Sequence, residues 1–496
     1  MNSQTYNMKR IIHTLIVSVI LPVGAIAQNA SSTPFTLDDC IKYALENTID
    51  VKNARVDEQI ADAKVKETFG IGLPQIDGSV AVQHNAKLPR FFATYQVAKG
   101  FGGGEDNPDN PLNGLGLEDS DVVAMPNFFQ LPSSGSAGVT VNQLLFNTTY
   151  LVGLKAAGTY KELSERSSEQ TQIQVIENVT KAYYAVLVNN ERITLFDNNI
   201  ARVDSLLRTT TALNQNGFAE AIDVDRTQVT LNNLKSERLK FLNLQNLSLG
   251  LLKFQMNYPM EKDLNVAGSL SDLRVNENLF NEYEEGWDYK NRIEYRMLDT
   301  QRRLLELDIK NQQSHSYPSL VGFANFGYLT QSPNISGVFK TNTNLSDNGQ
   351  VGPDQWYPYS SFGVSLRVPI FSGLQRTYQV QQAKLSLLKT ENQFTSLKQG
   401  IDLSIQQNTI EYKNALETFR SQRENMELAD RVARVTKIKY EQGVGSNIEV
   451  TDAEASLRES QVNYYNALFD AIIAKINLDK AYAKIDPTQY ITPTTK

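Results

Sequence analysis

The chain has 496 residues, with 48 Lys and Arg, 55 Asp and Glu, and a formal net charge of −7. Because it has no basic surplus to neutralise phosphates, nucleic acid is not an expected partner. One cysteine excludes an internal disulfide framework, and three histidines leave little for metal or acid–base chemistry. Charged residues make up 21% of the chain, which does not fit a polytopic helical membrane protein.

The first 27 residues have the pattern of an export signal. A basic pair precedes a short apolar run over 11–26, and the Ala-Ile-Ala sequence ending at Ala27 fits a cleavage site. The alternative is a membrane anchor, but the run is interrupted by a proline and a glycine and is shorter than the ~20 apolar residues that a spanning helix needs. We therefore predict a signal peptide at 1–27.

The rest of the chain reads as two copies of one pattern, offset by about 225 residues. The segment 142–147 corresponds to 368–373, and a glycine turn at Gly217 corresponds to one at Gly443. The predicted units are 28–258 for the first copy, 259–281 for a connecting segment, 282–485 for the second copy and 486–496 for a tail.

Each copy is predicted to contain a helix, two strands and a long helical hairpin. Thr36 and Asp39 form a capping-box pattern, and the helix that they start is expected to reach about Phe69. Its counterpart is expected from about Asn276 to Ser314. Residues that stop a helix or turn the chain mark the joints between helices and strands. These joint residues are Pro74, Pro318, Pro369 and Gly373.

Four strands are predicted from the alternation of apolar and polar residues, at 75–85, 135–146, 318–330 and 359–371. Aromatic residues flank them as an interfacial belt would. These aromatics are Tyr317, Phe323, Trp356, Tyr357, Tyr359 and Phe371. A soluble sheet packed on helices would show the same alternation.

Two stretches, 147–215 and 374–441, contain almost no proline or glycine, and a helix of that length would span about 100 Å. The last helix carries apolar residues in heptad steps from Val450 onward, which is typical of a helix-packing seam. In the preceding helix, four residues lie off the corresponding stripe: Leu416, Leu428, Val432 and Val435. We therefore expect that helix to contact neighbours on two sides.

Four strands cannot close a barrel, and an open sheet leaves backbone groups unpaired in lipid. If these strands lie in a membrane, several chains must share one barrel. Two chains give eight strands filled by side chains, and three give twelve strands around a lumen.

In combination, these motifs resemble the outer membrane efflux protein family, the TolC-like channels, over nearly the whole mature chain. They are Phe35-Thr36-Leu37, Ala44-Leu45-Glu46-Asn47, the proline joints at 74 and 318, Val368-Pro369-Ile370-Phe371-Ser372-Gly373, and Tyr440-x-x-Gly443 with Ile448-Glu449-Val450 and Ala453. The resemblance implies a mixed α and β fold. It implies a homotrimer with a shared twelve-stranded barrel in outer membrane lipid and a helical tunnel across the periplasm. It also implies docking onto a periplasmic adaptor and an inner-membrane pump.

The resemblance also assigns roles to residues near the two hairpin turns. The adaptor-docking positions are Gly217, Phe218, Gly443 and Val444, and the positions that constrict or gate the pore are Glu449, Asp452, Asp223 and Tyr440. Some members close the tip with a tyrosine–arginine set, and here Gly445 stands at the arginine position. The alternative for the acids is an ordinary solvated place near a helix N-terminus.

Other segments are weaker signals. The acidic stretch 100–121 lacks EF-hand spacing, and its Gly102-Gly103-Gly104 run lacks the Lys-Ser/Thr of a phosphate loop. No catalytic motif is recognised, so no enzyme, metal or cofactor is expected. We expect a passive exit duct of a tripartite efflux or type I secretion system. The sequence does not identify its cargo. The rival hypotheses are an exported coiled-coil scaffold without a pore and an autonomous porin.

Overall fold

The computed structural model describes residues 34–101, 116–127, 129–268, 270, 283, 286–340, 342–343 and 355–490. The predicted signal peptide, the centre of the acidic stretch 100–121, most of 269–282 and the tail beyond 490 lie outside the described residues.

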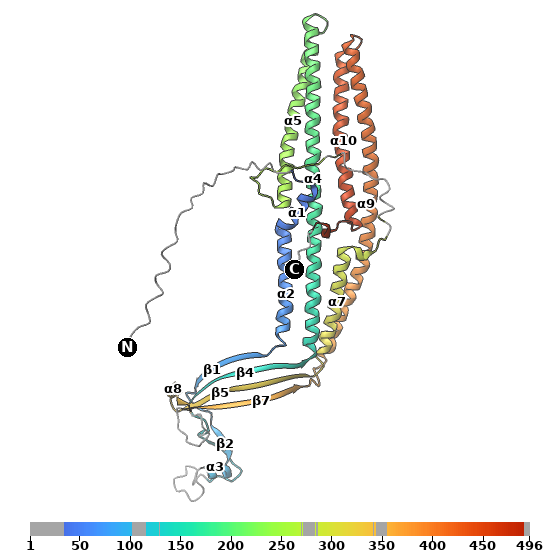
Figure 1. Cartoon of the computed structure of the whole chain (residues 1–496). Helices are drawn as coiled ribbons and strands as arrows, with labels where there is room; N and C mark the ends of the chain where they lie inside the picture. The colour runs from blue at the N-terminus through green and yellow to red at the C-terminus, as the bar shows by residue number, and fades with distance from the viewer. Residues whose placement is uncertain are drawn as a thin grey trace, which may run out of the picture.

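Long helices form one end of the molecule and a sheet forms the other (Figure 1). Two of the helices are very long, α4 (Thr148–Gln215) and α9 (Gln375–Glu441). At a rise of about 1.5 Å per residue, the 68 residues of α4 span roughly 100 Å. Each packs against a shorter antiparallel partner to make a hairpin, α5 (Ala221–Met256) with α4 and α10 (Asn447–Ala481) with α9. The two hairpin tips lie at the end far from the sheet (Figure 1).

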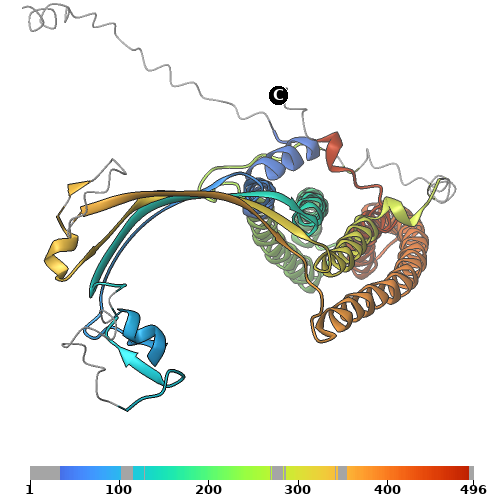
Figure 2. The same cartoon turned by 90° about the horizontal axis from the view of Figure 1, so that it is seen from below.

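Shorter helices complete the half of the wall nearer the sheet. Helix α2 (Ile49–Gly70) packs on α4, and α7 (Ile293–Ser314) packs between α4 and α9. Seen along their length in Figure 2, the helices follow one curved row. The row therefore has two edges, α2 and α5 on one side and α9 on the other. None of the helices that the structure describes is both long and apolar enough to cross a membrane.

Four long antiparallel strands form the sheet, in the order β1 (Gln75–His84), β4 (Ser133–Asn147), β5 (Ser319–Ser332) and β7 (Gln355–Arg367). The two-residue β6 (Asn342–Thr343) pairs in parallel with Gln355 and Trp356, the first two residues of β7. A separate pair, β2 (Phe91–Thr94) and β3 (Val122–Met125), lies with α3 (Tyr95–Phe101) beyond the strand ends (Figure 1). A single turn, α8 (Ile335–Val338), follows β5.

The pairing register puts the apolar sets of the four strands on one face of the sheet. Ile76 pairs with Val141, Val141 with Ala324, and Ala324 with Phe362. The next row along the strands joins Asp77, Thr140, Asn325 and Ser361. Because neighbouring rows point to opposite faces, the sheet has one apolar and one polar face, which confirms the face assignment made from alternation.

Three of the six aromatic residues that flank the strands lie on the polar face of the sheet, so they do not belong to a belt on the apolar face. The register places Phe323, Tyr357 and Tyr359 in the rows of the polar face. The Phe323 ring lies against Gly363, and the Tyr359 ring lies against Gly138 and Gly327, each position having no side chain to displace it.

Three predicted boundaries are wrong. The first helix breaks at Thr48, whose ψ of 141° separates α1 (Leu37–Asn47) from α2. The Thr48 hydroxyl and N–H both donate to the Ala44 carbonyl, which ends α1 without a proline or glycine. The expected Asn276–Ser314 helix begins at Ile293, after a short 3-10 turn, η2 (Tyr289–Asn291); Asn276 lies outside the described residues.

The third wrong boundary is that of the last strand. It was expected at 359–371 and runs from Gln355 to Arg367 instead. It stops before Pro369, which has no N–H to give to a ladder. Backbone turns at Gly373 and Leu374, with φ of 61° and 65°, then lead into α9.

The main apolar core lies around the middle of α4, where α1, the last turns of α5 and the second half of α10 meet it. Ile41, Leu45, Val179, Leu252 and Met256 are almost fully buried there. The N-terminal segment is tied in by a bridge between Phe35 and Val266. The heptad seam of α10 is also confirmed, because Val450, Leu457 and Leu478 are buried to within 1% of their surface. This seam packs α10 on α9.

Candidate functional site

The two hairpin tips have the same backbone geometry. Gly217 and Gly443 adopt φ of 79° and 74°, a left-handed conformation in which glycine is unstrained. At the first tip the Phe218 N–H donates to the Leu213 carbonyl at 2.8 Å. At the second, the Val444 N–H makes the equivalent bond at 3.0 Å. Each turn therefore ends its helix with a backbone cap and directs the next residue outward.

Those next residues are the most exposed apolar side chains near the tips. Phe218 is 82% exposed and Val444 is 78% exposed. Neither packs on its own hairpin, so the far end of the molecule presents two apolar contacts to its surroundings. Exposed apolar side chains grouped at one end of a molecule are typical of a protein-contact site.

Tyr440 lies just before the second turn and faces the other hairpin. Its side chain is 8% exposed, and its hydroxyl lies 3.1 Å from the Thr210 hydroxyl of α4. The amide of Asn447 on α10 donates to Thr210 and to Thr227 of α5, both at 3.3 Å. One buried polar cluster thus joins all four hairpin helices below the tips. Gly445 packs against the backbone of Tyr440 and carries no arginine contact.

The structure separates the three predicted acidic residues. Glu449 and Asp452 are exposed on the first turns of α10, three residues apart and hence on one helix face. The Glu449 N–H is capped by the Ser446 hydroxyl. Asp223 is half-buried and accepts a hydrogen bond from Arg226 at 3.2 Å, which neutralises it. Only the second hairpin therefore presents exposed carboxylates at these positions.

Glu454 is an ionisable group of the same helix that sequence reasoning missed. It is 8% exposed, and its carboxylate lies 3.1 Å from the Arg202 guanidinium of α4. Burial raises the pKa of Glu454, against the attraction of Arg202. One feature of the sequence could have indicated its burial: Glu454 directly follows Ala453, a residue of the packing seam. At that position its side chain faces the neighbouring hairpin.

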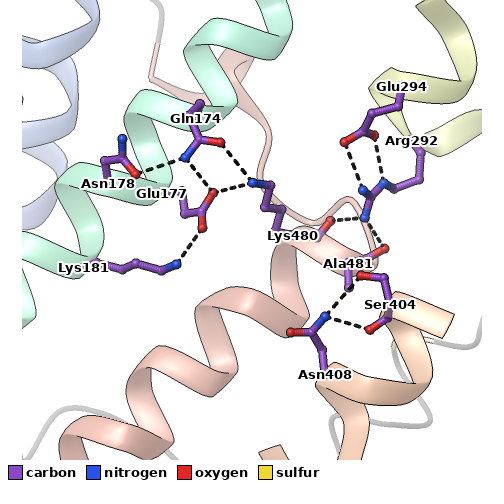
Figure 3. A network of polar contacts seen from close by, with 10 residues as sticks. All are labelled: Gln174, Glu177, Asn178, Lys181, Arg292, Glu294, Ser404, Asn408, Lys480 and Ala481. Carbon is purple, nitrogen blue, oxygen red and sulfur yellow. Dashed lines mark hydrogen bonds and ion pairs between the residues drawn. The ribbon is translucent and has the colours of Figure 1, made fainter. Parts of the chain in front are cut away.

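A second polar network lies midway along the molecule, where α4, α7, α9 and α10 meet (Figure 3). Glu177 of α4 is 6% exposed and accepts hydrogen bonds from Lys181 at 2.6 Å and Lys480 at 2.7 Å. Arg292 donates to the last carbonyls of α10, those of Lys480 and Ala481, at 3.0 and 2.9 Å. This cation caps the negative end of the α10 dipole. No sequence motif marks this network, because Lys480 and Arg292 lie far from Glu177 along the chain.

The predicted joint residues lie where the chain passes between helix and strand. Pro74 directly precedes β1 and Pro318 directly precedes β5. Pro369 and Gly373 lie in the connection from β7 to α9. The joints thus fix the direction in which each strand leaves the helical wall.

Both edges of the curved wall carry exposed apolar side chains. On α9 these include Leu428, Val432 and Val435, three of the four residues that the heptad analysis expected to meet a second neighbour. The fourth, Leu416, is buried in one cluster with Leu478 of α10. On α5 at the other edge they include Val229, Leu247 and Phe254. Within the part of the chain that the structure describes, no element covers these side chains.

Comparison with known proteins defines the class. The family described as "Outer membrane efflux protein" matches residues 111–249 and 295–484, about two thirds of the chain. The chain therefore belongs to the outer membrane efflux protein family, whose members are channels and not enzymes.

Individual relatives agree with this assignment. The chain is 20% identical to outer membrane protein TolC of Vibrio cholerae over 346 residues, covering 70% of this chain and 76% of that protein. The crystal structure of VceC from Vibrio cholerae superposes with a TM-score of 0.64 at 13% identity, covering 90% and 96% of the two chains. The open-state structure of MtrE from Neisseria gonorrhoeae gives 0.66 at 16% identity, with coverage of 90% and 88%.

The protein is a TolC-like outer membrane efflux channel with a transport role. It sits in the outer membrane and extends a helical tunnel wall into the periplasm.

Proposed function

We propose that three copies of this chain close a twelve-stranded barrel and a twelve-helix tunnel. The assembly is a passive exit duct of a tripartite efflux or type I secretion system. Substrate enters from a periplasmic adaptor and an inner-membrane pump, and leaves at the cell exterior. The pump supplies the energy. The two-copy internal repeat then gives each chain two strand pairs and two hairpins in the shared wall.

The observation that carries this proposal is that the sheet has backbone groups without strand partners at both of its edges. The outer edge of β1 is unpaired along all ten residues, within the strands that the structure describes. The outer edge of β7 is covered only at Gln355 and Trp356. Unpaired backbone groups at a sheet edge are too costly in hydrocarbon, so these edges need partners. A second and third copy supply them, and the same rotation covers the apolar edges of α5 and α9.

The faces of the sheet fit this assembly. Phe362 and Val364 on the apolar face are 86% and 62% exposed in the single chain, as expected for side chains that contact lipid tails. Thr140 and Asn325 on the opposite face hydrogen-bond to each other at 2.9 Å and suit a water-filled lumen. The exposed Phe218 and Val444 then become the adaptor contacts at the periplasmic tips. Glu449, Asp452 and Tyr440 line or control the narrow end, with Glu449 and Asp452 making a negative ring that favours cations.

Two measurements test the proposal. Purified protein reconstituted in a planar bilayer is expected to conduct ions without a nucleotide. In cells, a photo-crosslinking residue at Phe218 or Val444 is expected to capture a periplasmic adaptor, whereas one at exposed Glu165, far from the tips on α4, is not. Absence of conductance, or equal capture from all three positions, would contradict the proposed duct and its docking end.

A further inference from the structure

Of the Asp, Glu, Lys and Arg residues of the chain, only two lie in the four long strands. Asp77 is the third residue of β1, and Arg367 is the last residue of β7. Strands β4 and β5 contain no Asp, Glu, Lys or Arg. Two opposite charges therefore occur in this part of the molecule, and each lies on one of the two edge strands.

Both charges lie on the polar face. Asp77 belongs to the row that continues through Thr140 and Asn325 to Ser361. Arg367 is six residues beyond Ser361 on the same strand, and the β5–β7 register is unbroken between them. Because side chains alternate with a period of two, Arg367 shares the face of Ser361 and hence that of Asp77.

The two charges also lie at the same end of the sheet. Asp77 follows the joint with α2, and Arg367 precedes the joint with α9. Strands β1 and β7 are the two edge strands of the long sheet, and no strand that the structure describes pairs with the outer side of either one at this end. The short β6 pairs with β7 only at the opposite end. Among the described residues, neither Asp77 nor Arg367 has an ion-pair partner. The two side chains cannot pair within one chain, because β4 and β5 lie between β1 and β7. Their charges are therefore unneutralised in the single chain.

We propose that Asp77 of one copy and Arg367 of the next form an ion pair across the junction between β7 and β1, on the lumen side. This inference rests on the proposed trimer. The strands run in opposite directions, since β1 leaves the helices and β7 returns to them, so the junction is antiparallel like the other three. Directly opposite side chains of such a pair have Cβ atoms about 4.5–5.5 Å apart, within reach of an Asp–Arg contact.

The ion pair sets the register of the junction. With Asp77 opposite Arg367, Val80 lies opposite Val364 and Val82 opposite Phe362, all on the apolar face. A slip of one residue would place Asp77 opposite Leu366, whose side chain lies on the other face of the sheet, and a regular ladder does not allow that pairing. A slip of two keeps the faces but separates the charges. The charge pair thus selects one register among those that the alternation of faces allows.

Cysteine cross-linking tests the contact. The double variant Asp77→Cys/Arg367→Cys is expected to form covalent dimers and trimers on oxidation of native outer membranes. Asp77→Cys/Leu366→Cys is the matched control, since its second thiol points to the opposite face, and Asp77→Cys/Ser365→Cys reports a two-residue slip. The native Cys40 is fully buried and does not compete. Cross-linking through Leu366 or Ser365 in place of Arg367 would overturn the register.

Charge reversal tests the energetics. Asp77→Arg and Arg367→Asp each place like charges across all three junctions, and each is expected to lower the temperature at which the trimer dissociates in detergent. The combined variant restores opposite charges and is expected to recover most of the shift. If the wild type is a trimer but neither reversal shifts the transition and the first cysteine pair stays unlinked, the ion pair is refuted and the duct stands. If the wild type is not a trimer, the proposed function fails first.

Discussion

The buried carboxylate of Glu177 provides a quantitative test of how the two hairpins are joined midway along the wall. Glu177→Gln keeps the shape of the side chain and removes its charge, leaving Lys181 and Lys480 beside a neutral amide (Figure 3). Hydrogen bonds to charged groups contribute about 1.5–3 kcal/mol each. Because the two lysines are 30% and 33% exposed and recover hydration, the expected cost of the substitution is about 2–4 kcal/mol.

The assay is hydrogen exchange followed by mass spectrometry on the detergent-solubilised protein. Amides of α4 and α10 around Glu177 and Lys480 are expected to exchange about 30- to 700-fold faster in Glu177→Gln, since each 1.4 kcal/mol is a factor of ten. Glu165→Gln on the same helix is the matched control, because it removes an exposed carboxylate. Equal protection in the Glu177 variant and the control would show that the Glu177 carboxylate does not hold the two hairpins together.

The same site has a defined pH dependence. Burial opposes ionisation of Glu177, but hydrogen bonds and charges from Lys181 and Lys480 outweigh it and hold its pKa below the ordinary value of 4.5. A lowered folded-state pKa means that the stabilisation is fully present above pH 4.5 and is lost as pH falls through the lowered pKa. The exchange difference between wild type and Glu177→Gln should therefore shrink on acidification.

Three further predictions concern the pore and its ends. Replacing Glu449 and Asp452 by their amides is expected to weaken cation preference, measured as a reversal potential in a salt gradient across a planar bilayer; unchanged selectivity would remove both from the pore. The pKa of Glu454 is raised by burial, so its contribution to stability is present below the ordinary value of 4.5 and is lost as pH rises through the raised pKa. Glu454→Gln should abolish that part of the pH dependence of thermal unfolding, and an unaltered profile would count against it. Phe362→Arg places a charge on the apolar face and is expected to cost up to about 2–4 kcal/mol and reduce outer membrane assembly, whereas Ser361→Arg on the polar face should assemble normally; equal assembly would contradict the face assignment.

The strands and seams were predictable because their signals are local. The period-two alternation of Ile76, Val80 and Phe362 encodes which residues share the apolar face, and the pairing register of the sheet agrees with it. The heptad steps from Val450 to Leu478 similarly encode the face that packs on α9. The capping box of Thr36 and Asp39 also forms as expected.

The errors arise where tertiary contacts decide. Helix α1 ends at Thr48 because its backbone turns to an extended ψ of 141°. Its hydroxyl bond to the carbonyl four residues back is one that threonines inside helices also make, so the residue type does not mark the break. Lys181 lies four residues after Glu177, but Lys480, its other partner, and Arg202, the partner of Glu454, come from segments more than 250 residues distant, so no spacing rule could identify those two. Asp223 was grouped with the exposed acids by position alone, and its pairing with Arg226 distinguishes it from them.

The central claim is that the unfinished edges of one chain are completed by two more copies of it. The most direct test is the mass of the protein extracted by detergent from the outer membrane fraction, measured by light scattering with correction for bound detergent. The shared barrel predicts a particle with three times the mass of the mature chain, which is extracted only with detergent. A water-soluble monomer or dimer absent from that membrane would contradict the shared barrel and favour a coiled-coil scaffold without a pore.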